Sequence, residues 1–288
     1  MPGPHPSSHG ASDKPPPFTI QPTAPHTHSF LLLHGLGSNG EKFGRELLET
    51  GVCSNGKSLM DEFPGARFIF PTAKRRRSSA WRRAKLTQWF DIASLDDPSH
   101  RSDTQLEGLA ESSREILGLI NQESREVPRG NIILGGLSQG CAISLCCLLA
   151  MDCPIGGFIG MSGWLPFQKD IKNLTKDDEE EFDGENPFAS SEQDTQDLVA
   201  KVVSFARDLL DLDEPGQATK VNSAIATPIF LGHGNVDDKI KPSLGEDACE
   251  TLRAVGFDVL WRTYKDQGHW YKIPDEIDDL AAFIREKA

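Results

Sequence analysis

The fold is decided by the stretch Asn131-Ile-Ile-Leu-Gly-Gly-Leu-Ser138-Gln-Gly-Cys-Ala-Ile-Ser-Leu-Cys-Cys-Leu-Leu-Ala150. The apolar, partly β-branched run 132–134 is stopped by two glycines, which predicts a short buried strand. Residues 139–150 have almost no polar face, which predicts a helix that is covered on all sides. Between them lies a G-x-S-x-G motif in the strand-to-helix setting that this motif needs. Ser138 is therefore a candidate nucleophile, and the alternative is a surface serine in an ordinary glycine-rich turn.

Composition narrows the class of protein. A chain of 288 residues with 38% hydrophobic content can form one large α/β domain. A net charge of −13 argues against nucleic acid as a partner. The longest apolar run, 141–151, is too short to cross a bilayer. The first residues lack the basic start and apolar core of a secretory signal. We therefore expect at most peripheral contact with membranes. For the oligomeric state, which composition does not determine, we expect a monomer or weak homodimer.

Cysteine usage indicates the compartment. Three of the six cysteines lie in the predicted helix 139–150, where they cannot bridge one another, and the chain has no C-x-x-C. This pattern is typical of reduced thiols, so we expect a cytoplasmic protein without a metal site or other cofactor. The histidines of the first 28 residues could bind a metal, but histidines of a flexible tail are the favoured interpretation.

The rest of the chain alternates strands and helices. Residues 1–27 are rich in Pro, Ser, Gly and His without periodicity, which predicts a disordered tail before a domain at 28–288. The alternation in this domain predicts a mostly parallel sheet with right-handed crossovers and helices on both faces. Ser38 and Glu41 have the spacing of a capping box, so a helix should start there and end near Thr50.

Two charged segments interrupt the rhythm. The basic segment 74–85 predicts a solvated loop, with an anion site or a nuclear import signal as alternatives, so the nucleus is a second candidate location. An insertion at about 168–224 holds the acidic stretch 177–185, which predicts a solvated loop, and a helical pattern at 198–212. Both charged loops follow strands, and we hypothesise that they attract each other as a salt-sensitive latch over the pocket.

Candidate catalytic residues follow strands. Loops after parallel strands lie on one edge of a sheet, and this edge should collect His34-Gly35-Leu36, Ser138, Asp237 and His269. Ser138 needs a base, because a free hydroxyl is a poor nucleophile near neutral pH. His269 can supply this base, with Asp237 or its neighbour Asp238 on the other ring nitrogen. The turn after His34 suits an oxyanion hole, although a plain strand-to-helix turn is the alternative.

Together these segments resemble the acyl-protein thioesterase/carboxylesterase family of α/β-hydrolases, also called the phospholipase/carboxylesterase family. The Leu-Ser-Gln-Gly and Ser-Gly-Trp-Leu-Pro stretches are specific to that family. The matching segments are Leu33-His-Gly-Leu-Gly37, Trp89-Phe-Asp91, Ile133-Leu-Gly-Gly-Leu-Ser-Gln-Gly140, Ser162-Gly-Trp-Leu-Pro166, His233-Gly-Asn-Val-Asp237 and Gly268-His269.

The resemblance implies an α/β-hydrolase fold and a role for each matching residue. It implies Ser138 as nucleophile, Asp237 as acid in preference to Asp238, and His269 as base. It further implies an oxyanion hole formed by the backbone N–H groups of Leu36 and Gln139. The implied substrate contacts are Trp164 and Leu165.

The expected activity is hydrolysis of acyl thioesters or esters, on an acylated protein or a small ester, through an acyl-enzyme intermediate. Two alternatives stay open: a small-molecule carboxylesterase of a biosynthetic pathway, and a catalytically silent hydrolase-fold binding module. The chain departs from the family pattern at Cys141, where a second glycine is usual, and at Asp238, which replaces a common proline. These departures concern the substrate more than the chemistry.

Overall fold

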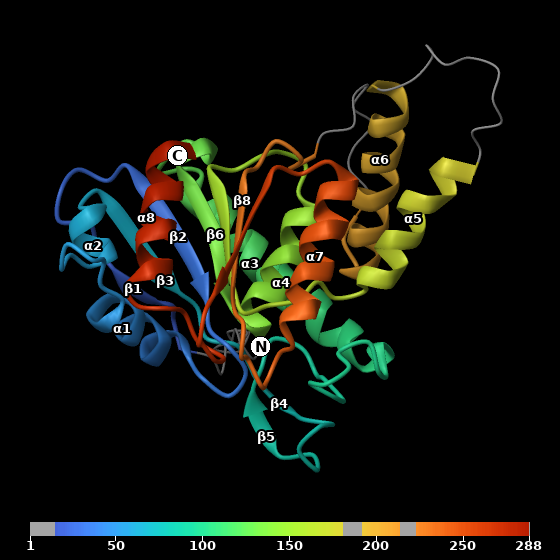
Figure 1. The fold of residues 1–288 in the computed structure, drawn as a ribbon, viewed down its shortest axis with the longest axis horizontal. Helices are drawn as coiled ribbons and strands as arrows, with labels where there is room; N and C mark the ends of the chain where they lie inside the picture. Colours follow the sequence, from blue (N-terminus) through green and yellow to red (C-terminus); the bar gives the residue numbers. More distant parts are fainter. Residues whose placement is uncertain (1–14, 181–191, 214–222, 288) are drawn as a thin grey trace, which may run out of the picture.

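The computed structural model describes residues 15–180, 192–213 and 223–287. Within them a seven-stranded sheet has the order β1-β3-β2-β6-β7-β8-β9, shown in Figure 1. All neighbours pair in parallel except β1 and β3, as the alternation of strands and helices predicts. The strands are β1 (Phe18–Ile20), β2 (His28–Leu33), β3 (Ala66–Phe70), β6 (Ile132–Leu137), β7 (Gly157–Met161), β8 (Ile229–Gly234) and β9 (Val259–Tyr264).

Helices cover both faces of the sheet, so the central strands β2, β6, β7 and β8 are buried on both sides. The helices are α1 (Gly40–Thr50), α2 (Leu59–Glu62), α3 (Leu106–Glu123), α4 (Gln139–Ala150), α5 (Gln168–Glu180), α6 (Glu192–Leu209), α7 (Pro242–Val255) and α8 (Asp275–Lys287), with short 3-10 turns η1 (Ser102–Gln105) and η2 (Arg129–Asn131). Figure 1 shows α1, α2 and α8 on one side and α3, α4 and α7 on the other.

Alternation along β2 shows how the two cores form. Leu31 and Leu33 belong to the core under α3, α4, α6 and α7, whereas Phe30 and Leu32 belong to the core under α1 and α8. Successive side chains of a strand point to opposite faces, so one apolar run supplies both layers. Every residue of α4 is buried, as predicted from a sequence with almost no polar face. The central strand and helix are thereby fixed from all sides.

The ordered body begins earlier than the sequence predicts. Phe18–Ile20 pairs with the far edge of β3, and the Phe18 ring lies 6.2 Å from that of Phe70. Three residues are too few to show an alternating pattern, which is why the predicted tail extended wrongly to residue 27. Residues 1–14 of that tail lie outside the described part of the chain. A smaller correction concerns α1, whose cap is Asn39, accepting from the Lys42 N–H at 2.8 Å, and not Ser38.

The basic segment is a hairpin and not a solvated loop. Strand β4 (Arg75–Arg77) pairs antiparallel with β5 (Lys85–Thr87). Lys74 and Arg76 form ion pairs with Glu111 of α3. The cations proposed for the latch are thus bound to a helix of the main body.

The insertion is helical on both sides of its acidic stretch. Residues 177–180 continue α5, whereas 181–185 lie outside the described residues. Figure 1 shows α5 running away from the β4–β5 hairpin. Lys74 and Arg76 thus pair with Glu111, and the predicted latch stays a prediction because its acidic partner lies largely outside the described residues. The helix expected over 198–212 is observed as α6, and its side chains at Leu198, Val202 and Ala206 join the core beside α4. Among the described helices, none has the length and apolar character needed to span a bilayer.

Candidate active site

Ser138 occupies a strained turn between β6 and α4. Its backbone angles, φ 57° and ψ −120°, are unfavourable for a residue with a side chain. The Ser138 N–H donates to the Met161 carbonyl at 2.8 Å, which ties the turn to β7. A Cβ at Gly140 would lie 2.1 Å from the carbonyl oxygen of Leu33, so the turn closes against β2 only with glycine there. The motif read from the sequence is therefore a steric requirement.

The structure brings Ser138, His269 and Asp237 together. His269 Nε2 lies 2.9 Å from Ser138 Oγ, and His269 Nδ1 lies 2.7 Å from Asp237 Oδ2. Because an ionised carboxylate only accepts, the proton sits on Nδ1 and Nε2 accepts from the serine hydroxyl. Asp237 follows β8 and His269 follows β9, so the ends of three strands supply the set. This arrangement makes the hydroxyl a stronger nucleophile.

Asp237 is held as an anion. Its Oδ1 accepts from the backbone N–H groups of Lys239 at 2.8 Å and Ile240 at 3.0 Å. Burial alone would raise the pKa of Asp237, but hydrogen bonds from His233, His269 and the Ile240 N–H outweigh it and leave the pKa well below its usual range. Asp238, the rival from the sequence, is exposed, and its carboxylate contacts Lys239 Nζ at 3.1 Å.

The loop with the expected oxyanion donor Leu36 is fixed by hydrogen bonds to one peptide. The Gly35 carbonyl accepts from His34 Nδ1 at 2.7 Å and from the Ser38 N–H at 3.2 Å. His34 Nε2 accepts from the Ala73 N–H at 3.0 Å, which places the ring proton on Nδ1. In a trans peptide the C=O and the next N–H point in opposite directions. The Leu36 N–H is thereby directed away from His34.

The second expected donor is the N–H of Gln139, the first residue of α4. The N–H groups of a helix's first turn have no acceptor within the helix and are available to an anion. Gly35 lies beside this turn, since a Cβ on it would be 3.4 Å from Ser138 Cβ. Both expected donors therefore belong to segments next to Ser138.

A buried strut joins these two segments, and sequence reasoning missed it. The Gln139 side chain accepts from the Trp89 N–H at 3.0 Å and donates to the Phe90 carbonyl at 2.8 Å. The Trp89 indole N–H donates to the His34 carbonyl at 2.8 Å. Gln139 and Trp89 are 1% and 0% exposed. A buried amide and indole need partners, which is the signal that could have pointed to this role.

A cavity of about 250 Å³ opens beside Ser138 and His269. Its apolar walls come from the loop after β2, the β4–β5 hairpin and the segments after β5, β8 and β9. They include Leu36, Trp81, Leu95, Ile240 and Trp270. The predicted substrate contacts Trp164 and Leu165 do not line it. They are 2% and 3% exposed, and they border a separate hollow of about 370 Å³. Among the described residues, no three His, Cys, Asp or Glu side chains are grouped as metal ligands.

Comparison with known proteins identifies the family. A family model described as phospholipase/carboxylesterase matches residues 15–179. The chain belongs to this family. It is 32% identical to acyl-protein thioesterase 1 of Yarrowia lipolytica over 94% of this chain and 96% of the relative, and 28% identical to that of Gibberella zeae over 94% and 95%. The crystal structure of Zea mays acyl-protein thioesterase 2 covers 94% of this chain and 98% of its own, with 24% identity and a TM-score of 0.65.

Membership of the phospholipase/carboxylesterase family confirms the predicted class: the protein is an ester or thioester hydrolase with the α/β-hydrolase fold. The likeness to the maize enzyme extends over nearly the whole of both chains, so the fold assignment does not rest on the central motif alone.

Proposed function

We propose that this hydrolase acts on acyl thioesters or esters with Ser138 as nucleophile, His269 as base and Asp237 as acid. The observation that carries the proposal is the continuous contact from Asp237 through His269 to Ser138 beside an apolar cavity. Ser138 Oγ attacks the acyl carbonyl while its proton moves to His269 Nε2. The negative oxygen is held by the N–H groups of Leu36 and Gln139. Each such donor contributes about 2.7–4 kcal/mol of transition-state stabilisation.

Three further proton transfers complete the cycle. His269 gives the proton to the departing thiol or alcohol as the tetrahedral intermediate collapses to an acyl-enzyme. Water then takes the place of the leaving group and loses a proton to the same Nε2 as it attacks the acyl carbon. As the second tetrahedral intermediate collapses, His269 gives this proton to Ser138 Oγ, which releases the acid and restores the serine hydroxyl. No cofactor enters these steps.

We propose an acylated protein as the substrate, in keeping with the names of the relatives, acyl-protein thioesterase 1. The walls formed by Trp81, Leu95 and Trp270 suit an acyl chain. In this proposal the enzyme works in the cytoplasm, with the nucleus as a second location, as a monomer or weak homodimer in at most peripheral contact with membranes. The net charge of −13 supports a soluble enzyme.

A small-molecule ester is the second candidate substrate. The cavity of about 250 Å³ is smaller than the roughly 300–1,000 Å³ of pockets that hold drug-sized ligands, which favours a short acyl group. Steady-state hydrolysis of p-nitrophenyl esters from acetyl to palmitoyl separates the two. A long-chain optimum supports the deacylase, and a short-chain optimum supports the small-ester hydrolase.

The control variant is Ser138→Ala. It should lose turnover and labelling by a fluorophosphonate probe while it keeps the thermal unfolding midpoint of the wild type. Equal turnover in the variant would refute the mechanism. A wild type that neither turns over esters nor reacts with the probe would instead favour the catalytically silent binding module.

A further inference from the structure

A second histidine contacts the carboxylate of Asp237. His233 lies at the end of β8 and is 1% exposed. Its Nε2 is 3.2 Å from Asp237 Oδ2 and 3.0 Å from the carbonyl oxygen of Ile240. Asp237 Oδ2 is also the atom that accepts the hydrogen bond from His269 Nδ1–H. Two imidazole rings therefore share one carboxylate oxygen.

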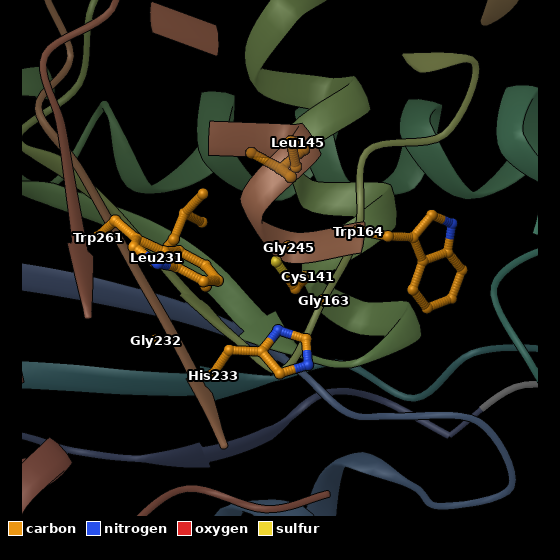
Figure 2. A pocket seen from close by; sticks show the side chains of 11 residues that line it. Cys141, Leu145, Gly163, Trp164, Leu231, Gly232, His233, Gly245 and Trp261 are labelled. Atoms are coloured by element: carbon orange, nitrogen blue, oxygen red, sulfur yellow. The ribbon is translucent and has the colours of Figure 1, made fainter. Parts of the chain in front are cut away.

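The surroundings of His233 fix which nitrogen carries its proton. Both neighbours of Nε2 are acceptors, so the hydrogen is on Nε2 and is shared between them. Nδ1 has no hydrogen-bond partner among the described residues. In Figure 2 the ring faces a small buried cavity of about 10 Å³, whose walls include Leu145, Leu231 and Trp261. The ring thus has one polar side and one apolar side.

Packing holds this ring in place. A Cβ at Gly245 of α7 would lie 2.6 Å from His233 Nδ1, so the helix backbone presses against the apolar side of the ring. The Trp261 ring from β9 is 6.1 Å away, centre to centre. His233 is consequently held between α7 and Asp237, and its donor stays aimed at Oδ2.

We propose that His233 is a positioning residue for the proposed reaction: its Nε2–H holds Asp237 Oδ2 in the orientation that receives His269 Nδ1–H. Two backbone N–H groups hold Oδ1 of Asp237, and His233 Nε2–H holds Oδ2. Both oxygens of the carboxylate are therefore fixed in position. It acts through Asp237 and His269 and does not touch the substrate cavity. This inference rests on the proposed function of the Ser138 site.

His233→Leu and His233→Gln test the inference as a pair. Leu fills the site without a donor, whereas the Gln amide nitrogen reaches about as far as Nε2 and keeps one. The loss of a hydrogen bond to a charged group predicts that kcat of His233→Leu falls roughly 10- to 100-fold, with KM little changed. Rates are expressed per active site titrated with the fluorophosphonate probe, so that partly unfolded protein does not count. His233→Gln should recover most of the rate.

The pH profile of kcat/KM gives a readout that a purely structural role would not move. The titratable groups that face the Asp237 carboxylate are His233 and His269, and Lys239 contacts it through its backbone N–H. A carboxylate that has lost the His233 donor attracts the imidazolium form of His269 more strongly, and this form cannot act as a base. The acid limb should therefore move to higher pH in His233→Leu and stay near the wild-type position in His233→Gln. Equal profiles and rates in all three proteins would overturn the inference.

If His233→Leu does not fold, His233→Asn and His233→Gln are compared instead. His233→Asn keeps an amide but is one methylene shorter than Gln, so its nitrogen should fall short of Oδ2. Asn slower than Gln, with a shifted acid limb, supports the inference, and equal behaviour of the two refutes it. If the wild type lacks Ser138-dependent turnover, the proposed function itself has failed, which is a distinct result.

Discussion

Glu276 of α8 offers a quantitative test of how burial acts next to the site. The side chain is 1% exposed, Oε2 accepts from the Lys272 N–H at 2.9 Å, and Oε1 has no hydrogen-bond partner among the described residues. Burial raises the pKa of Glu276 to about 8, although the Lys272 N–H acts in the opposite direction. Lys272 belongs to the loop between β9 and α8 that also carries His269, and a Cβ on Gly232 of β8 would lie 2.2 Å from Oε1. The buried carboxyl thus supports both strand and loop.

The sign of the pH effect follows from the pKa. In the unfolded chain the carboxyl loses its proton near pH 4.5, whereas the folded protein keeps it up to about pH 8. Between these values the unfolded state has released a proton that the folded state holds, so rising pH lowers the free energy of unfolding. The whole interval corresponds to a loss of roughly 5 kcal/mol at pH 8 and above. Glu276→Gln keeps an acceptor for the Lys272 N–H and removes the titration.

Urea unfolding followed by tryptophan fluorescence at pH 5, 6, 7 and 8 measures this effect. The free energy of unfolding of Glu276→Gln, relative to wild type, should rise steadily over this range by a few kcal/mol. Glu286→Gln, an exposed change on the same helix, is the control and should follow the wild type. Parallel curves for wild type and Glu276→Gln would show that Glu276 is ionised in the folded protein and would refute the reasoning.

Three further changes have expected outcomes. Gly140→Ala places a methyl group against a backbone carbonyl of β2, so it should lower the free energy of unfolding by roughly 1–3 kcal/mol or more and abolish turnover. The control is Gly118→Ala, which has open space around it and should be neutral or stabilising in thermal unfolding. Trp89→Phe removes the indole N–H that donates to the buried His34 carbonyl, so kcat should fall about tenfold with a loss of roughly 1–3 kcal/mol of stability. An unchanged kcat would contradict the role given to this hydrogen bond. Trp81→Ala should raise KM for apolar acyl esters while changing stability by less than about 0.5 kcal/mol, because Trp81 is 40% exposed and lines the cavity; an unchanged KM across acyl chain lengths would exclude Trp81 as a substrate contact.

The three residues of the candidate triad could be predicted from the sequence. Ser138, Asp237 and His269 follow strands in the order of a triad, and parallel strands bring such loops to one edge whatever the details of packing. The choice of Asp237 over Asp238 came from a family resemblance. The structure gives a physical reason for it: Asp237 is buried and accepts from two backbone N–H groups, whereas Asp238 is exposed.

Features that depend on contacts between distant segments were not predictable in this way. The role of Phe18 rests on its pairing with β3, almost fifty residues away, and a three-residue strand has no visible periodicity. Trp164 carries a family-specific motif, but its ring packs on Phe90 and not in the cavity. The strut of Gln139 and Trp89 likewise joins three segments that the chain separates widely.

The position of α6 has a consequence for engineering the chain. Leu198, Val202 and Ala206 pack beside α4. The insertion therefore helps to shield α4, the helix that follows Ser138, from solvent. A truncation that removed 168–224 would uncover part of α4, a fully buried and mostly apolar helix that begins directly after Ser138, and such a surface promotes aggregation. Shortened versions of this enzyme should therefore retain α6 as a whole.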